Sequence, residues 1–283
     1  MKHGLSIDVE DYYQIILKDY YALDTDPSPE VERNTQWILD LLSELHVHAT
    51  FFVLGIVAKH YLSLIRRMAD EGHEIGSHGY DHRQIFTMSP QEFSSAIKKS
   101  KSLIEDFTGQ QVLGHRAPAF SITEESYWAL DILASAGFLY DSSIYPVKGR
   151  RYGIKHGQKI IHRFSNGLYE IPLSCITLWG TSLPVAGGGY LRHFPYWWTR
   201  FAVNHISRQG RPGIVYLHPY EFELTPPHLN NAAESLPLKR RYKLFIHNLL
   251  QSNNRGTRHR QKFISLLSDF SFCPLRSLLP ETS

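Results

Sequence analysis

The segment HEIGSHGYDH, residues His73 to His82, places a short apolar run directly before a group of polar side chains. The same arrangement recurs along the chain in runs that are rich in apolar and β-branched residues. These runs are HGLSIDV (3–9), HATFFVLG (48–55), HEIGSH (73–78), QVLGHRAP (111–118), FLYDSSI (138–144), LYEIPLS (168–174) and GIVYLHP (213–219). We expect each of them to form a strand of a parallel sheet, with helices between them.

Segments with 3.6-residue periodicity lie between the expected strands. Residues 29–45 repeat apolar side chains on one face, and residues 123–137 do the same. The segment 89–109 has Ser89 as N-cap, Pro90 after it, Glu92 completing a capping box and Gly109 at its end. No repeat or low-complexity linker interrupts the pattern. The sequence predicts an α/β barrel over residues 1–222 and a helical extension over residues 223–283 that packs on it.

The composition is that of a globular protein. Of 283 residues, 42% are hydrophobic and 20% charged, and the net charge is +3, which is too small to indicate nucleic-acid binding. The two cysteines, Cys175 and Cys273, are far apart and suggest neither a disulfide framework nor a cysteine metal site. The start of the chain lacks an apolar signal region, so we expect a cytoplasmic location, at most peripheral at the inner membrane face.

The most basic stretch is residues 239–260, where cations alternate with apolar residues. A solvated amphipathic helix is the first interpretation of this pattern. The alternative is a contact with a membrane surface, an acidic polymer or proteins of polysaccharide assembly.

Polar residues gather where each expected strand ends. The set is Asp8, Glu10 and Asp11 at the end of the first strand, His78 and His82 at the end of the third, then Arg116, Asp141 and His218 at the ends of later ones. In parallel α/β barrels, the loops after the strand C-termini form the active site, so these residues are expected to converge.

Two histidines and a carboxylate are the ligands of an open catalytic zinc or a similar divalent ion. The first strand offers Asp8, Glu10 and Asp11 as candidates. One of them would bind the metal, and a second, kept ionised by Arg116, would take the proton from water. His218 is the titratable group that would protonate the leaving group.

Each motif also has a structural interpretation. Sixteen histidines predict roughly one H-x-x-x-H pair by chance, so the spacing of His78 and His82 alone proves nothing. We expect His73 to be structural and Asp81 to form a turn or support the ligands. Residues Gly187 to Gly189 indicate a tight turn rather than a phosphate loop, and no G-x-S-x-G motif is present.

Six stretches in order, LSIDVEDYY, ATFFVLG, HEIGSHGYDH, HRAPAFS, YDSSIYP and VYLHPYE, resemble the NodB-homology polysaccharide deacetylases, carbohydrate esterase family 4. The segments EIPLS, LPVAGGGYLRHFPY and LHPYEF are similar to the C-terminal portion of one branch of this family, the branch associated with bacterial exopolysaccharide clusters. The resemblance implies a distorted (β/α)7 barrel that binds a divalent metal, with zinc first and nickel or cobalt as alternatives. It further implies Asp8 as general base, His78 and His82 as metal ligands, Arg116 orienting the base, Ala119 donating its N–H to the oxyanion, Leu217 lining the acetyl pocket and His218 as general acid.

Three departures from the family pattern affect these roles. The usual adjacent aspartates are replaced by Asp8-Val9-Glu10-Asp11, so the metal carboxylate is Glu10 or Asp11, and we favour Asp11. Phe120 stands where a glycine is usual. The D-x-x-x-W motif, whose Asp tunes the acid histidine, has no clean match, and the candidates for its roles are Asp141, Glu170 and Trp179.

The resulting hypothesis is a metal-dependent N-deacetylase that acts on N-acetylhexosamine units of a bacterial exopolysaccharide or its precursor. Aromatic side chains are candidates for stacking on sugar rings, namely Tyr12, Tyr13, Tyr80, Trp179 and Tyr190. Two alternatives remain at this point. One is a deacylase or amidohydrolase of a small non-sugar amide, because fold does not fix substrate. The other is an inactive glycan-binding barrel.

Overall fold

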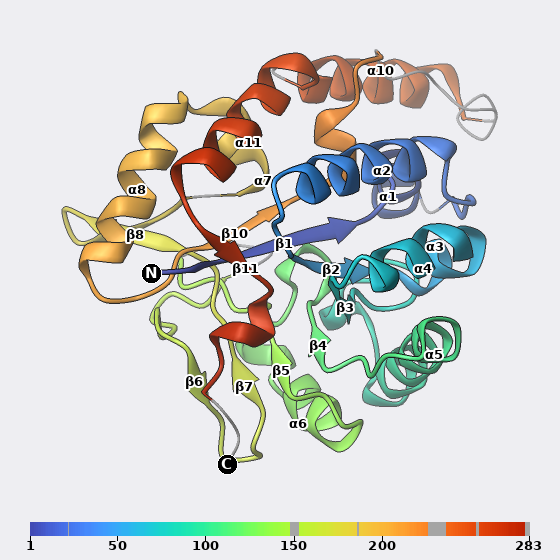
Figure 1. Ribbon diagram of the computed structural model, residues 1–283. Coiled ribbons are helices and arrows are strands. Elements are labelled where there is room, and N and C mark those ends of the chain that lie inside the picture. Colours follow the sequence, from blue (N-terminus) through green and yellow to red (C-terminus); the bar gives the residue numbers. More distant parts are fainter. Residues whose placement is uncertain (22, 148–152, 186, 226–235, 253–254, 281–283) are drawn as a thin grey trace.

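The computed structural model describes residues 1–21, 23–147, 153–185, 187–225, 236–252 and 255–280. The main sheet has nine strands, which curl into a half barrel (Figure 1). They are β1 (His3–Val9), β2 (Thr50–Val53), β3 (Glu74–Ser77), β4 (Gly114–His115), β5 (Tyr140–Asp141), β6 (His162–Arg163), β7 (Tyr169–Glu170), β10 (Ile214–Leu217) and β11 (Phe272–Cys273). The expected α/β fold class is confirmed.

The strand order is β10-β1-β2-β3-β4-β5-β7-β6. Every pairing from β10 to β7 is parallel, and only β6 runs antiparallel to its neighbour. The seven expected strand segments therefore all contain a strand of this sheet. A separate antiparallel hairpin, β8 (Cys175–Leu178) with β9 (Thr181–Pro184), lies outside it.

The helices alternate with the strands and pack on one side of the sheet (Figure 1). They are α1 (Tyr12–Tyr21), α2 (Pro29–Glu44), α3 (Gly55–His60), α4 (Leu62–Asp70), α5 (Pro90–Thr108), α6 (Trp128–Ser135), α7 (Gly188–His193), α8 (Tyr196–Arg208), α10 (Leu238–Ser252) and α11 (Thr257–Asp269). Helix α5 has the N-terminal cap and the C-terminal glycine that the sequence predicts for it. Ser89 and Glu92 form the capping box, and Gly109 ends the helix with a φ of 68°. Among the described helices, none is long and apolar enough to cross a bilayer.

The C-terminal segment is more than helical. After α11, β11 pairs with the start of β1, His3 with Phe272 and Gly4 with Cys273. The backbone N–H of Leu275 then donates to Thr50 Oγ1 on β2, at 2.8 Å. The end of the extension thus joins the same sheet as the first strand. Residues 253–254, inside the expected helical stretch, lie outside the described part.

The two faces of β1 separate the core from the site. Leu5, Ile7 and Val9 belong to the apolar core shared with the helices. Ser6 and Asp8 point the other way, because side chains alternate along a strand. Ser6 pairs with Tyr216 and Asp8 with Phe52, two members of the aromatic cluster on the concave side. The concave face therefore presents the polar residues of β1 among aromatic side chains.

Candidate active site

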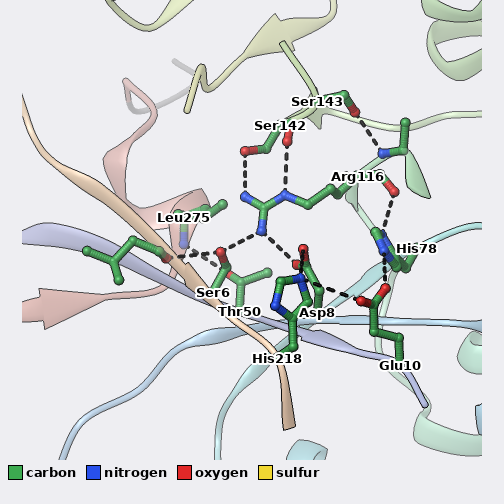
Figure 2. Close-up of polar contacts among 12 residues, drawn as sticks. Ser6, Asp8, Glu10, Thr50, His78, Arg116, Ser142, Ser143, His218 and Leu275 are labelled. Carbon is green, nitrogen blue, oxygen red and sulfur yellow. Dashed lines mark hydrogen bonds and ion pairs between the residues drawn. The ribbon is translucent and has the colours of Figure 1, made fainter. Parts of the chain in front are cut away.

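Asp8 and Arg116 form a buried ion pair on the concave side of the sheet (Figure 2). Arg116 Nη1 lies 2.7 Å from Asp8 Oδ1 and 2.7 Å from Ser6 Oγ. Its Nε and Nη2 donate to the backbone O and the Oγ of Ser142, at 2.9 and 2.8 Å. The guanidinium also lies over the Phe52 ring, 4.3 Å from its centroid. A fully buried cation is thus satisfied by fixed partners, which hold one carboxylate oxygen of Asp8 and leave Oδ2 toward His218.

Glu10 lies beside His78 and His82. Its Oε2 is 3.2 Å from His78 Nε2 and 3.0 Å from His82 Nε2, and ligand atoms of the three residues all lie within 4.8 Å of one another. The arrangement follows from the strand period, since Asp8 and Glu10 point to the same side of β1. Burial alone would raise the pKa of Glu10. The charges of His82 and His218 and hydrogen bonds from the two imidazoles outweigh it and bring that pKa well below its usual value.

The donor set of Glu10, His78 and His82 fits an open divalent metal site. Two imidazole nitrogens and one carboxylate are a common catalytic zinc set. His78 Nδ1 lies 2.9 Å from the backbone oxygen of Arg116, a contact that fixes the ring with Nε2 toward Glu10 (Figure 2). The loop after β4 thus orients both the carboxylate Asp8 and the imidazole His78.

Asp11, which the sequence favours as the metal carboxylate, lies at the start of α1 and not beside the histidines. Its Oδ1 accepts from the backbone N–H of Gln14 at 2.8 Å, as an N-cap does at the start of α1. Its Oδ2 accepts hydrogen bonds from the hydroxyl and the backbone N–H of Ser28. Because these bonds turn the carboxylate away from the imidazoles, the structure favours Glu10 over Asp11 as the metal carboxylate.

His218 faces both carboxylates from the end of β10. Its Nε2 lies 3.5 Å from Glu10 Oε1 and 4.0 Å from Asp8 Oδ2. On the other side of the ring, Nδ1 lies 3.2 Å from Glu221 Oε2. Burial lowers the pKa of His218, but the charges of Glu10 and Glu221 raise it to about 9. His218 is therefore cationic at neutral pH in the metal-free chain.

Glu221 is the functional candidate that sequence reasoning missed. It lies in the short 3-10 turn Pro219–Phe222 and also accepts from the backbone N–H of His218 at 3.0 Å. Burial would raise its pKa, but the hydrogen bond and charge of His218 lower it to about 2. The signal was present in LHPYEF, because an acid three residues after a capping position reaches back to it.

The residues considered for tuning the acid lie elsewhere. Asp141 Oδ1 lies 2.7 Å from His115 Nδ1, and Glu170 accepts from the backbone N–H of Ile144 at 2.9 Å. Trp179 is 96% exposed at the turn between β8 and β9, away from the strand ends that carry His218 and Glu10. None of the three has a described contact with His218, and in this structure Glu221 occupies the place considered for Asp141 and Glu170.

Leu217 does not face the site. It pairs with Ile7 and belongs to the core shared with the helices, because the strand period turns it away from the concave side. Its neighbour Tyr216 pairs with Ser6, and its ring centroid lies 5.6 Å from that of His218. Tyr216 is therefore the side chain of β10 that lines the concave side.

The loop after Arg116 has an unusual backbone. Ala119 and Phe120 both have a φ of 52°, in the left-handed region that residues other than glycine rarely adopt. Within the described part of the chain, no group accepts a hydrogen bond from the Ala119 N–H. Phe120 packs edge-on against Tyr145 and Tyr216, with centroids 5.7 and 4.9 Å apart. The Phe120 packing thus holds a strained turn with a backbone donor available.

The remaining candidates are mostly structural. His73 accepts from the backbone N–H of Ala49 at 3.3 Å, and Asp81 pairs with Lys18 at 2.8 Å. Tyr80 lies under Lys99, whose Nζ is 3.8 Å from its centroid, and Tyr12 and Tyr13 lie in the cluster between α1 and α10.

Gly187 and Gly188 allow α7 to approach the site. A Cβ on Gly187 would lie 2.4 Å from the Tyr216 ring, and one on Gly188 would lie 3.3 Å from His218 Cε1. These glycines permit the close approach of backbone to rings. Tyr190 follows on α7, with its ring 6.4 Å from Phe194.

Two family models match consecutive parts of the chain. Residues 18–140 match the model described as polysaccharide deacetylase. Residues 142–280 match one described as a domain of unknown function, DUF3473. The first match ends at Tyr140 and the second begins at Ser142, so Arg116 and its partner Ser142 belong to different models.

Curated relatives match only part of the chain. It is 33% identical over 107 residues to a peptidoglycan deacetylase of Helicobacter pylori, covering 38% of this chain and 36% of that protein. It is 34% identical over 111 residues to a peptidoglycan-N-acetylglucosamine deacetylase of Bacillus cereus, covering 39% and 40%. The chain thus matches less than half the length of these relatives.

A solved structure shares the whole fold. A putative polysaccharide deacetylase from Mycobacterium smegmatis superposes with a TM-score of 0.58 over 99% of this chain and 92% of that one. The identity is 18%, so this likeness concerns the fold.

Proposed function

Because residues 18–140 match the polysaccharide deacetylase model, we propose that the chain is a metal-dependent hydrolase that removes N-acetyl groups from N-acetylhexosamine units of a bacterial exopolysaccharide or its precursor. The observation that carries the proposal is the convergence of three groups on one concave face. They are the pair Asp8–Arg116, the trio Glu10, His78 and His82, and the acid His218. The relatives' names, peptidoglycan and peptidoglycan-N-acetylglucosamine deacetylase, support an N-acetylated sugar as substrate.

Glu10, His78 and His82 would hold the divalent ion, with zinc preferred by this donor set and nickel or cobalt as alternatives. Such an ion polarises an amide carbonyl and lowers the pKa of water. Asp8 accepts the proton of the attacking water on Oδ2, because Arg116 occupies Oδ1. His218 donates its proton to the departing amine. The water oxygen bonds to the acetyl carbon, the C–N bond breaks, and acetate and a free amino sugar leave.

The backbone of the loop after Arg116 completes the proposal. In this proposal, the Ala119 N–H donates a hydrogen bond to the oxygen that becomes negative when water adds to the carbonyl. Tyr216 would flank the acetyl group in place of Leu217, since it lies on the concave side next to His218.

The experiment measures acetate released from an N-acetylglucosamine oligomer by the metal-loaded protein. We expect turnover in the wild type and none in His78→Ala/His82→Ala, while the control His46→Ala/His48→Ala, an exposed pair elsewhere, keeps it. N-acyl amino acids and cyclic ureides are assayed alongside. Turnover of those compounds without turnover of the sugar would contradict the proposed substrate, and binding of the oligomer without acetate release would contradict the proposed reaction.

A further inference from the structure

Helix α10 exposes an apolar stripe. Leu238, Tyr242 and Phe245 are 80%, 67% and 54% exposed. Their spacing of four and three residues places them on one face of the helix. Single exposed apolar side chains are common on soluble proteins. Three on one helical face form a contiguous apolar patch, whose exposure to water is unfavourable.

The same helix is strongly basic. Lys239, Arg240 and Lys243 are exposed, Arg241 is half-buried, and α10 contains no acidic residue. None of the four cations forms an ion pair with a described residue. On a helical projection, Arg241 lies on one side of the apolar stripe and Lys239 and Lys243 on the other. The stripe is therefore bordered by positive charges that pair with no acid in the described part of the chain.

The opposite face of α10 anchors the helix beside the active site. Leu244 is fully buried and packs with Tyr13 and Leu17 of α1. The Tyr21 hydroxyl of α1 donates to the backbone oxygen of Arg240 at 3.3 Å. Helix α1 begins directly after Glu10 and Asp11, at the end of β1. Figure 1 shows α10 as the outermost helix above α1.

Helix α8 provides a contrast. Trp197 and Phe201 are 65% and 42% exposed, so this helix also presents aromatic side chains. Of its two arginines, however, Arg200 beside these rings pairs with Asp269 of α11 at 3.1 Å, and Arg208 lies in the last turn of the helix. Both helices thus expose aromatic side chains. Helix α10 has four cations without an ion-pair partner among the described residues, whereas α8 has only Arg208 in this state.

We propose that α10 binds an anionic lipid surface. An amphipathic helix with cations beside its apolar face lies in the plane of a membrane interface, with the apolar side chains at the boundary between headgroups and acyl chains. Lys239, Arg241 and Lys243 contact lipid phosphates, and Leu238, Tyr242 and Phe245 enter the boundary. An acidic polymer would satisfy the cations and leave the stripe in water, so the stripe favours lipid. The contact holds the active-site end of β1 close to a membrane.

The test is cosedimentation of the full chain with vesicles. One set contains phosphatidylcholine alone and the other equal parts of phosphatidylcholine and phosphatidylglycerol. We expect binding to the second set only, weakened by salt. Lys239→Gln/Arg241→Gln/Lys243→Gln should weaken it by about fivefold for each charge removed. Leu238→Ser/Tyr242→Ser/Phe245→Ser should abolish it, and the control Trp197→Ser/Phe201→Ser should bind as the wild type does.

Three results would overturn the proposal. The wild type does not sediment with anionic vesicles, the apolar variant of α10 binds as well as the wild type, or the α8 control loses binding to the same extent. The second result would show that the cations bind the anionic surface without any contribution from the apolar stripe. Circular dichroism confirms that each variant is folded. Acetate release from a soluble oligomer is measured on the same samples and should not change, so failure of lipid binding is distinguishable from failure of the proposed reaction.

Discussion

Asp8 and His218 face each other across the site, 4.0 Å apart, but their surroundings are built differently. Asp8 is held by Arg116, a fully buried cation that also donates hydrogen bonds to Ser6 and Ser142. His218 is held by Glu221 from the next turn of chain. Behind Glu221 lies the buried His259 of α11, with Nε2 3.9 Å from Glu221 Oε2, and the charge of Arg192 also acts on Glu221. The base side is a rigid network between strands, whereas the acid side depends on a local turn in the C-terminal half.

The largest effect is expected on the base side. Arg116→Met leaves Asp8 buried without its cation and should reduce the free energy of unfolding by about 3–5 kcal/mol. Urea unfolding measures this change. The control Arg67→Gln removes an arginine that pairs with Asp40 and Glu71 near the surface, and it should cost less than about 1 kcal/mol. Equal losses in the two variants would contradict the description of Arg116 as the centre of a buried network.

The next effect concerns catalysis by the base. Asp8→Asn keeps the size of the side chain but removes the proton acceptor, so kcat should fall by about 10²–10⁴. Acetate release is the measurement, and metal content should stay near the wild-type value because Asp8 is not a ligand in this account. Turnover close to wild type would assign the base to another residue.

The acid side is tested through its pKa. Burial lowers the pKa of His218, but Glu10 and Glu221 raise it to about 9, above the ~6.5 of an unperturbed histidine. Protonated His218 therefore stabilises the fold fully below pH ~6.5, and this contribution is lost as the pH rises through about 9. Glu221→Gln removes one of the negative charges that raise the pKa of His218, so that pKa should fall.

Imidazole NMR titration of the metal-free protein measures this shift. The matched control is Glu223→Gln, a buried acid two residues away that contacts Arg33 and Asn34 instead. His218 should titrate as in the wild type in that variant. An unchanged His218 titration in Glu221→Gln would show that Glu221 does not govern the acid.

The smallest effect is expected for Asp11, which caps α1 in this structure and does not contact the imidazoles. Asp11→Ala removes the N-cap of α1 and should cost about 1 kcal/mol of stability, as measured by urea unfolding. Asp11→Asn retains a capping group and should cost much less. If Asp11→Ala abolished metal binding while the fold remained intact, the capping assignment would be insufficient.

The sequence predicted which residues lie at the strand ends better than it predicted which of their side chains contact one another. Asp8, His78, Arg116 and His218 follow apolar runs, and parallel strands bring such positions to one end of a sheet. The choice between Glu10 and Asp11 depended on where β1 ends, because the strand period favours Glu10 while the helix start uses Asp11 as a cap. Boundaries shift by one or two residues in any assignment, and here one residue decided the ligand.

Leu217 and Glu221 show the other limits. Adjacent residues of a strand face opposite sides, so an error of one position replaced Tyr216 with Leu217. Glu221 was within a quoted motif, but its contact with His218 depends on a turn of four residues. The pairing of β11 with β1 joins residues about 270 positions apart, and no local pattern indicates it.

The most direct test of the central claim is the metal content of purified protein after loading with zinc, compared between wild type, Glu10→Gln and Asp11→Asn. We predict about one zinc per chain in the wild type and in Asp11→Asn, and a loss of zinc together with acetate release in Glu10→Gln. Zinc retained in Glu10→Gln and lost in Asp11→Asn would contradict the site formed by Glu10, His78 and His82.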